Sequence, residues 1–213
     1  MTTQPVSTLV GDMPPPLRAL LVERFTVSPL AYHNRDHITA MLEAMAASFS
    51  GLGEREARIL RYAIWLHDIV YDATATDNER RSADIALELL DWPEDELRAI
   101  ETCIMATKGH AADDALAQIL VDLDLAILAA DRADYRRYAL AIRDEYRIYP
   151  DAQYRAGRAR VLEHLSAAPL LRVLSRARGL AYDALEQQAR ANMRWECEAL
   201  GGNAPTVQAA LGG

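Results

Sequence analysis

Cysteine, phenylalanine and long apolar runs are scarce in this sequence. Two cysteines and two phenylalanines occur among its 213 residues. Because Cys103 and Cys197 lie far apart and each falls in a helical pattern, we expect two reduced thiols rather than a disulfide framework. No apolar run approaches the ~20 residues that a membrane-spanning helix needs, and no signal-peptide pattern opens the chain. We therefore expect a cytoplasmic protein that does not bind a membrane.

Positive charge is also in short supply. The chain has 23 Lys and Arg against 31 Asp and Glu, which gives a formal net charge of −8. An acidic protein repels a polyanion, so a nucleic-acid polymer is excluded as the expected partner. A small phosphorylated ligand stays compatible with this charge, because local arginines and a metal ion can override it.

β-Strand patterns are missing too, because no segment sustains an alternation of apolar and polar residues. Apolar residues instead recur every three or four positions, most clearly over residues 34–49 and 54–70, which is typical of helices. Further helices are expected at about 17–25, 79–90, 91–108, 113–130, 132–149, 152–165 and 182–200. The sequence thus predicts an all-α fold with one compact multi-helix domain over 14–200, a flexible N-terminus (1–13) and a flexible tail (201–213).

Three of the five histidines lie in two short segments of these helices. The segments are Tyr32-His33-Asn34-Arg35-Asp36-His37 and Trp65-Leu66-His67-Asp68. His33 and His37 are four residues apart, so a helix would present both on one face. His37 and His67 each continue the apolar stripe of their own helix, so we expect both to point inward.

Three aspartates stand among apolar neighbours in the same way: Asp68, Asp122 and Asp124. A carboxylate is costly to bury unless it is paired or bound to a metal ion. Imidazoles and carboxylates from three helices would offset that cost by converging on one divalent cation. Such mixed nitrogen and oxygen donors fit Mn, Fe, Mg, Co, Ni or Zn and select none of them. The alternative is that the histidines are core residues bonded to backbone or carboxylate groups.

The order of these residues resembles the HD superfamily of metal-dependent phosphohydrolases. That family is helical and carries a His, a later His-Asp and a still later Asp, which match His37, His67-Asp68 and Asp124. Residues two apart on a helix cannot face the same way, so only one of Asp122 and Asp124 is expected to be a ligand. We prefer Asp124, because the segment Asp-Leu-Ala-Ile-Leu that it opens is similar to the family's last motif.

The resemblance is closer to one branch of small bacterial HD phosphohydrolases and spans about residues 15–200. The segments that carry it are Tyr32-His33-Asn34-x-x-His37, Trp65-Leu66-His67-Asp68-Ile69-Val70-Tyr71, Asp77-Asn78-Glu79-x-x-Ser82-Ala83, Asp122-Leu123-Asp124-Leu125-Ala126-Ile127-Leu128, Arg143-Asp144-Glu145-Tyr146, Gly157-Arg158 and Ala189-Arg190-Ala191-Asn192. Each motif is moderately specific, and their joint order is more specific than any one of them.

The segment Tyr32-His33-Asn34-x-x-His37 also resembles the first motif of eukaryotic cyclic-nucleotide phosphodiesterases, which share the HD metal core. In those enzymes the first histidine protonates the leaving alkoxide and the second binds metal. By position, the resemblance implies that His33 is a general acid and His37 a ligand. The alternative for His33 is a surface histidine or one that contacts a ligand without binding the metal. Those enzymes carry a further histidine and a Gly-Asn segment after the His-Asp pair, which this chain lacks, so cyclic-nucleotide hydrolysis is not implied.

The resemblance implies a metal-dependent phosphohydrolase of a small phosphorylated metabolite, with a nucleotide favoured and a phosphomonoester, phosphodiester or pyrophosphate bond cleaved. One alternative is a non-catalytic, metal-containing module that binds or senses a nucleotide. Another is a metal-dependent hydrolase or oxygenase of a non-phosphate substrate, because a fold does not determine its chemistry. The apolar C-terminal helices fit either a homodimer interface or ordinary core packing.

Roles follow for the individual residues. The expected metal ligands are His37, His67, Asp68 and Asp124. The expected catalytic residues are His33, Asp68 and Glu79, where Glu79 orients water or, alternatively, faces the dipole at the start of its helix. The expected contacts to phosphate are Arg35, Lys108, His110, Arg143 and Arg158. For the three arginines and Lys108, the alternative is a solvated charge on the surface. For His110, the alternatives are a ligand of a second metal ion or a position at a helix end.

Overall fold

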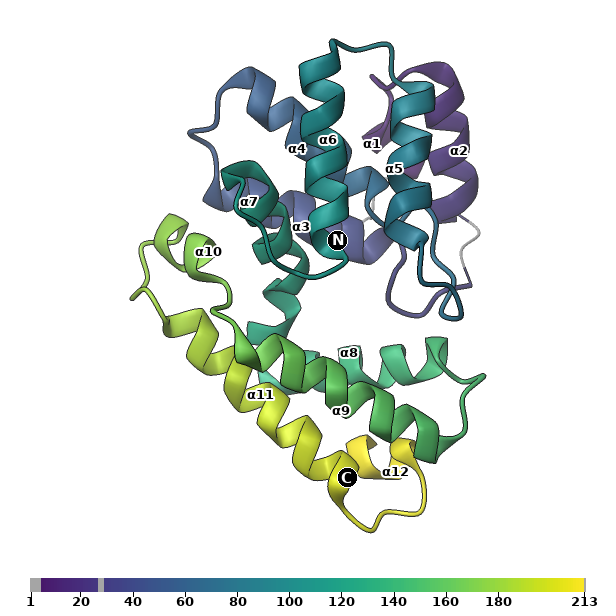
Figure 1. Ribbon diagram of the computed structural model, residues 1–213, viewed down its shortest axis with the longest axis vertical. Helices are drawn as coiled ribbons and strands as arrows, with labels where there is room; N and C mark the ends of the chain where they lie inside the picture. The colour runs from purple at the N-terminus through teal and green to yellow at the C-terminus, as the bar shows by residue number, and fades with distance from the viewer. Residues whose placement is uncertain (1–4, 27–28, 213) are drawn as a thin grey trace. The chain divides into compact units, whose positions relative to one another are not determined.

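The computed structural model describes residues 5–26 and 29–212, and every regular element within these ranges is a helix (Figure 1). The predicted all-α class is therefore confirmed. The helices are α1 (Val6–Leu9), α2 (Pro15–Thr26), α3 (Arg35–Ser48), α4 (Glu54–Leu66), α5 (Asn78–Leu89), α6 (Glu94–Thr107), α7 (Ala115–Asp124), the 3-10 helix η1 (Leu125–Ala129), α8 (Arg132–Glu145), α9 (Asp151–Ala167), α10 (Arg172–Ala177), α11 (Ala184–Gly201) and α12 (Val207–Gly212). In this part of the chain, no helix has both the length and the apolar character to cross a membrane.

The contacts between residues group the chain into two compact units, Met1–Val121 and Asp122–Gly213. The division falls inside α7, so this continuous helix begins in the first unit and ends in the second. That the chain forms one domain over 14–200 stays a prediction.

Helix α4 is the core of the first unit and packs against α3, α5 and α6. Its apolar residues recur at the spacing that places them on one face, and the segment from Tyr62 to Leu66 is buried throughout. Fully burying each large apolar side chain stabilises the fold by about 1.5–3 kcal/mol. Phe25 of α2 meets the buried ring of Trp65 edge-on, with 5.6 Å between ring centroids. The C-terminal end of α4, where His67 follows, is thus firmly held within its unit.

Helix α11 is the core of the second unit and packs against η1, α9, α10 and α12. Asn192 is fully buried, and its amide group donates to the carbonyl oxygens of Leu128 and Ala130, each at 2.8 Å. Those two bonds tie the end of η1 to α11. Buried apolar residues such as Leu162 and Met193 fill the space between α9 and α11.

Two terminal segments that we expected to be flexible contain short helices. In the first, α1 is formed and Val6, Val10 and Met13 are buried. In the second, α12 packs on α8 and α11 and buries Val207 and Leu211. Apolar residues at spacings of three and four are present in both segments, but each run is too short to predict a helix without the surface that it covers.

The two cysteines are free, as expected from their separation in sequence. Cys103 is fully buried in α6, and burial raises the pKa of its thiol to about 12. Cys197 is half-buried in α11. Because the thiolate is the reactive form, Cys103 behaves as a small apolar core residue.

Candidate metal centre

The start of α3 places His37 in the first helical turn. Asn34 caps the helix, since its side-chain oxygen accepts a hydrogen bond from the backbone N–H of Asp36 at 2.8 Å. The side-chain nitrogen of Asn34 donates to the carbonyl oxygens of Leu30 and Ala31, each at 3.2 Å. The cap thereby links the preceding loop to the helix and fixes where His37 emerges. His37 is buried, with 6% of its surface exposed.

The end of α4 places and orients His67. The residue caps the helix, is 1% exposed, and has its Nδ1 atom 2.9 Å from the carbonyl oxygen of Ile64. A carbonyl oxygen only accepts hydrogen bonds, so Nδ1 carries the proton in this contact. A neutral imidazole protonated on Nδ1 keeps its lone pair on Nε2. This is the arrangement by which proteins orient a histidine that binds metal through Nε2.

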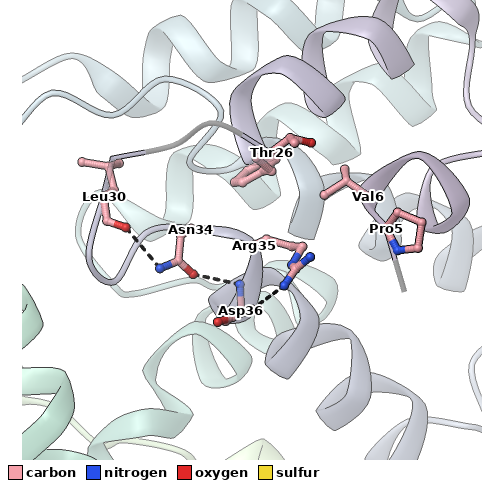
Figure 2. Close-up of a pocket in the computed structure, with 8 residues that line it drawn as sticks. Pro5, Val6, Thr26, Leu30, Asn34, Arg35 and Asp36 are labelled. Atoms are coloured by element: carbon pink, nitrogen blue, oxygen red, sulfur yellow. Dashed lines mark hydrogen bonds and ion pairs between the residues drawn. The ribbon is translucent and has the colours of Figure 1, made fainter. Parts of the chain in front are cut away.

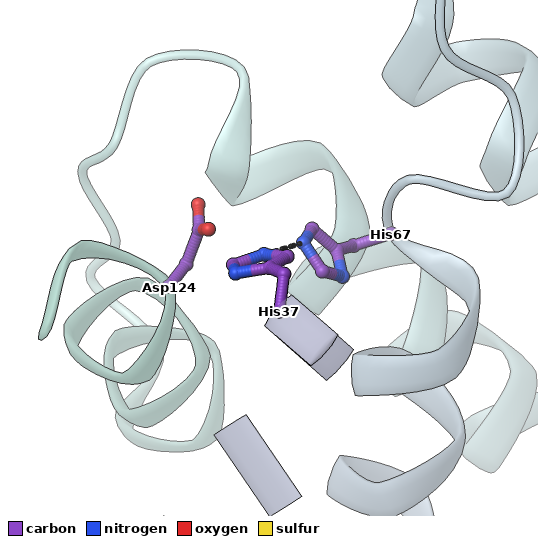
Figure 3. A group of neighbouring side chains, drawn as sticks. All are labelled: His37, His67 and Asp124. Carbon is purple, nitrogen blue, oxygen red and sulfur yellow. Dashed lines mark hydrogen bonds between the residues drawn. The ribbon is translucent and has the colours of Figure 1, made fainter. Parts of the chain in front are cut away.

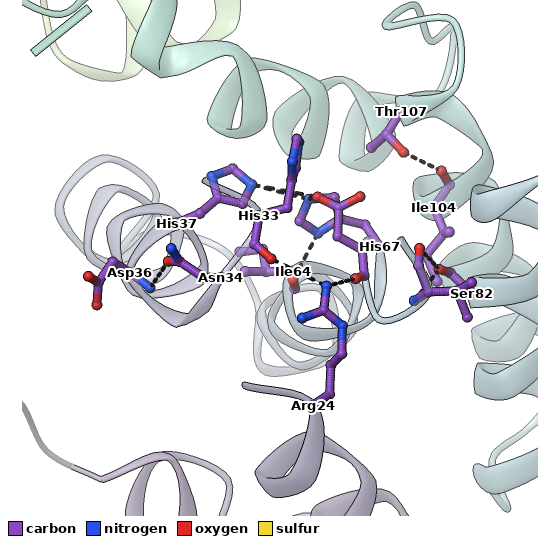
Figure 4. Close-up of polar contacts among 12 residues, drawn as sticks. Arg24, His33, Asn34, Asp36, His37, Ile64, His67, Ser82, Ile104 and Thr107 are labelled. Atoms are coloured by element: carbon purple, nitrogen blue, oxygen red, sulfur yellow. Dashed lines mark hydrogen bonds and ion pairs between the residues drawn. The ribbon is translucent and has the colours of Figure 1, made fainter. Parts of the chain in front are cut away.

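Three donor atoms converge within the first unit. The Nε2 atoms of His37 and His67 are 3.3 Å apart, and Oδ2 of Asp68 lies 3.0 Å from Nε2 of His67 and 3.9 Å from Nε2 of His37 (Figure 4). Two nitrogens that each bind one ion at about 2.0–2.1 Å lie about 2.8–3.4 Å apart for angles between 90° and tetrahedral. The separation of the histidine nitrogens fits that interval. A proton shared between the two Nε2 atoms would also account for the 3.3 Å distance between them.

The fourth predicted ligand, Asp124, is the last residue of α7 and belongs to the second unit. In the first unit, the rings of His37 and His67 face each other, so that together with a carboxylate they can hold a metal ion (Figure 3). That Asp124 completes the group stays a prediction. Asp122 is used differently: it is 1% exposed, and its Oδ2 accepts the backbone N–H of Leu174 at 2.9 Å. Asp122 is thus bonded within its own unit, and Asp124 stays the candidate ligand of the two.

The chemistry of the donor set fits a divalent cation. The two imidazoles and Asp68 supply nitrogen and oxygen ligands, and the Asp68 carboxylate carries negative charge that a divalent ion neutralises. Both imidazoles are buried, and the Asp68 side chain is 16% exposed. Burying two imidazoles beside a carboxylate is costly, and a cation held between them would offset that cost.

Aromatic rings hold His33 beside His37. The His33 ring stacks on Tyr71, with 3.9 Å between centroids and 22° between planes. Tyr32 meets His33 edge-on at 5.0 Å and lies 4.8 Å from the His37 ring. The centroids of His33 and His37 are 5.9 Å apart. Tyr71 closes one of the resembling motifs but had no predicted role, because its ring contact with a residue 38 positions earlier leaves no trace in the sequence.

A cavity of about 320 Å³ lies at the N-terminal end of α3 (Figure 2). It is lined by Pro5, Val6, Phe25, Thr26, Leu30, Asn34, Arg35 and Asp36. Arg35, a predicted phosphate contact, lies at this cavity and has its Nη2 atom 3.4 Å from Asp36 Oδ1. The structure thus gives Arg35 an acidic neighbour, and a role in binding phosphate stays a prediction.

Other predicted residues of the first unit lie on α5 and around the end of α6. Glu79 is half-buried in the first turn of α5. Lys108 is exposed and donates to the carbonyl oxygen of Thr76 at 3.0 Å. His110 is half-buried and has a φ of 50°, which is uncommon for a residue other than glycine. Their predicted roles stay predictions.

Arg143 and Arg158 are buried and bonded inside the second unit. Arg143 is 6% exposed and donates to Asp151 Oδ1 at 2.8 Å and to the carbonyl oxygens of Tyr146 and Tyr149. Arg158 is 8% exposed and donates to both carboxylate oxygens of Glu196, at 2.8 and 3.1 Å. These bonds make both arginines part of the packing of their unit, so the structure lends no support to their predicted contact with phosphate.

Two side chains without a predicted role contact the turn after α4. Ser82 of α5 hydrogen-bonds the backbone of Val70, and Arg24 of α2 hydrogen-bonds the backbone of His33, Asp68 and Ile69 (Figure 4). Ser82 lies in a resembling motif, whereas Arg24 lies in an ordinary helical segment and no sequence pattern marks it.

Comparisons of the chain with family models, with curated proteins and with solved structures found no match. A function for this all-α protein therefore has to be argued from its own residues and their geometry.

Proposed function

We propose that this protein is a metal-dependent phosphohydrolase of the HD type that acts on a small phosphorylated metabolite, with a nucleotide favoured. The observation that carries the proposal is the convergence of His37 Nε2, His67 Nε2 and Asp68 Oδ2 at mutual distances of 3.0–3.9 Å. The order of these residues in the sequence, with Asp124 after them, is the second support. A divalent ion held there would acidify a coordinated water to a pKa of about 7 in favourable cases and withdraw charge from a phosphate oxygen.

The chain's own residues have separate tasks in this proposal. His37 and His67 supply neutral nitrogen ligands, and the Ile64 carbonyl keeps the His67 lone pair on Nε2. Asp68 and Asp124 supply the negative charge that retains a divalent ion. The buried flank formed by α4 limits access of bulk water to this side of the group, which strengthens each electrostatic interaction there.

His33 is the proposed proton donor to the leaving oxygen. Its ring is held against Tyr71 and lies beside that of His37. A general acid in reach of the leaving oxygen contributes about 10²–10⁴ in rate. Glu79, in the first turn of α5, is proposed to orient water.

Metal analysis followed by a substrate screen tests the proposal. Wild-type protein and the double variant His67→Ala/Asp68→Ala are compared for bound metal, and each is assayed with phosphomonoesters, phosphodiesters and nucleoside triphosphates in the presence of Mn²⁺, Co²⁺, Ni²⁺, Mg²⁺, Zn²⁺ or Fe²⁺. His164→Ala, which removes an exposed histidine of α9, is the matched control.

We expect the double variant to lose both metal and turnover and the control to keep both. Equal metal content in the double variant would overturn the ligand assignment. Metal binding without turnover of any phosphorylated compound would favour the nucleotide-sensing module instead.

A further inference from the structure

The turn after α4 carries Asp68 and needs hydrogen-bond partners for its carbonyl groups. The last carbonyls of a helix lack partners within the helix itself. Within this turn, the Leu66 carbonyl accepts from the N–H of Ile69 at 3.2 Å. The Val70 backbone is held from the side of α5, where Ser82 Oγ accepts its N–H at 3.2 Å and donates to its carbonyl at 3.4 Å. Two further carbonyls of this turn are those of Asp68 and Ile69.

Arg24 satisfies both of them from α2. Its Nε donates to the Ile69 carbonyl at 3.2 Å, and its Nη2 donates to the Asp68 carbonyl at 3.4 Å. The same Nη2 also donates to the carbonyl of His33 at 3.3 Å. One guanidinium group therefore joins the loop before α3 to the turn after α4 (Figure 4). A cation at the C-terminal end of a helix also interacts favourably with the helix dipole.

The base of the Arg24 side chain is fixed. The neighbouring Phe25 is 4% exposed and packs edge-on against Trp65, which is fully buried in α4. The Arg24 guanidinium also lies over the Phe25 ring, 5.1 Å from its centroid. Because α2 is anchored to α4 at this point, Arg24 can hold the two backbone segments at a set separation.

We propose that Arg24 is a positioning residue for the metal centre. It fixes the backbone of Asp68, whose side chain is a ligand, relative to the backbone of His33, four residues before the ligand His37. Its effect on metal affinity requires only the metal site, whereas any effect on catalysis rests on the proposed function. Arginine suits this task better than lysine, because a planar guanidinium reaches several acceptors at once and a compact ammonium group does not.

Cobalt binding by two Arg24 variants tests this proposal. Arg24→Met keeps the length of the stem and removes the donors, and Arg24→Lys keeps the charge. Arg18→Met is the matched control, because Arg18 lies on the same helix and donates to the Gly11 carbonyl at 3.0 Å. The readouts are the dissociation constant for Co²⁺ by calorimetry, the visible absorption spectrum of bound Co²⁺ and the thermal midpoint of the metal-free protein.

We expect Arg24→Met to weaken Co²⁺ binding by about 10- to 100-fold, the usual effect of removing a group that orients metal ligands. We expect it to alter the cobalt spectrum as well, with Arg24→Lys intermediate and Arg18→Met like the wild type. A lower thermal midpoint with unchanged affinity and spectrum would make Arg24 merely structural and overturn the proposal. If Arg24→Met does not fold, the test rests on Arg24→Lys. A Co²⁺ affinity and a cobalt spectrum of Arg24→Lys equal to those of the wild type would overturn the proposal.

The outcome separates this inference from the proposed function. Wild-type protein that binds Co²⁺ and hydrolyses no phosphorylated compound would refute the phosphohydrolase, while the cobalt results for Arg24 would stand. Wild-type protein that binds no Co²⁺ and no other divalent ion would overturn both.

Discussion

The Nδ1 atom of His67 lies 2.9 Å from the carbonyl oxygen of Ile64, one helical turn earlier. This contact assigns the proton to Nδ1 and leaves Nε2, which faces His37 and Asp68, as the atom with a lone pair. We expect ¹⁵N NMR of metal-free protein at pH 8 to find His67 in the Nδ1-protonated form. Detection of the Nε2-protonated form would mean that the ring does not present the ligand atom described above.

Replacing His33 with alanine shows whether this residue acts as a proton donor or as a metal ligand. If the His33 ring donates a proton, His33→Ala slows turnover by about 10²–10⁴ while the bound metal is retained. Metal content and initial rates are measured on the same preparation, with His164→Ala as the control. Loss of metal in His33→Ala would instead identify His33 as a ligand.

Acid stability depends on the pair formed by Asp151 and Arg143. The hydrogen bond from Arg143, followed by that from the Val207 N–H, holds the pKa of Asp151 below its ordinary value of 3.8. A lowered carboxyl pKa contributes stability above pH 3.8 that is lost as the pH falls through the folded-state pKa. Asp151→Asn should therefore lower the melting temperature at pH 7, and its difference from wild type should shrink as the pH falls below 3.8.

Asp144→Asn, which changes an exposed carboxylate of α8, is the control for that comparison. Thermal melts of the three proteins between pH 7 and pH 2.5 provide the measurement. A difference between Asp151→Asn and wild type that stays constant over this range would contradict the assignment of acid sensitivity to Asp151.

The buried pair of Arg158 and Glu196 stabilises the second unit. Tyr135 donates to the same carboxylate at 2.6 Å, and burial raises the pKa of this phenol, so it stays protonated. Arg158→Met would leave a buried carboxylate without its cation, which costs about 3–5 kcal/mol. Chemical denaturation should detect that loss, whereas Arg160→Met, at an exposed position of α9, should change stability by less than about 0.5 kcal/mol. Equal stability of the two variants would return Arg158 to the candidates for phosphate binding.

The helices that position the histidines could be predicted from the sequence, because their apolar periodicity is long and regular. The pattern over 34–49 corresponds to α3 (Arg35–Ser48), and the pattern over 54–70 corresponds to α4 (Glu54–Leu66). The short helices α1, α10 and α12 were not predicted. Each has six residues or fewer, and a helix of that length depends on tertiary contacts for its stability.

His37, His67 and Asp68 could be singled out from the sequence because each stands among the apolar residues of a predicted helix. That they bind metal stays a prediction. The surroundings of the ligands could not be predicted in the same way. Arg24 donates to backbone carbonyls 44 and 45 residues later in the chain. Every residue has a backbone carbonyl, so the sequence does not show which of them a side chain will contact. Arg143 matched a motif, but its partners are an aspartate and two carbonyls inside its own unit.

A crystal of the protein loaded with Co²⁺ tests the central claim most directly. Anomalous scattering at the cobalt edge locates the ion without reference to any assumed ligand. We expect one strong peak about 2.0–2.2 Å from Nε2 of both His37 and His67, with an oxygen of Asp68 or Asp124 also bound. A cobalt-loaded crystal whose anomalous peaks all lie away from these two histidines would contradict the account.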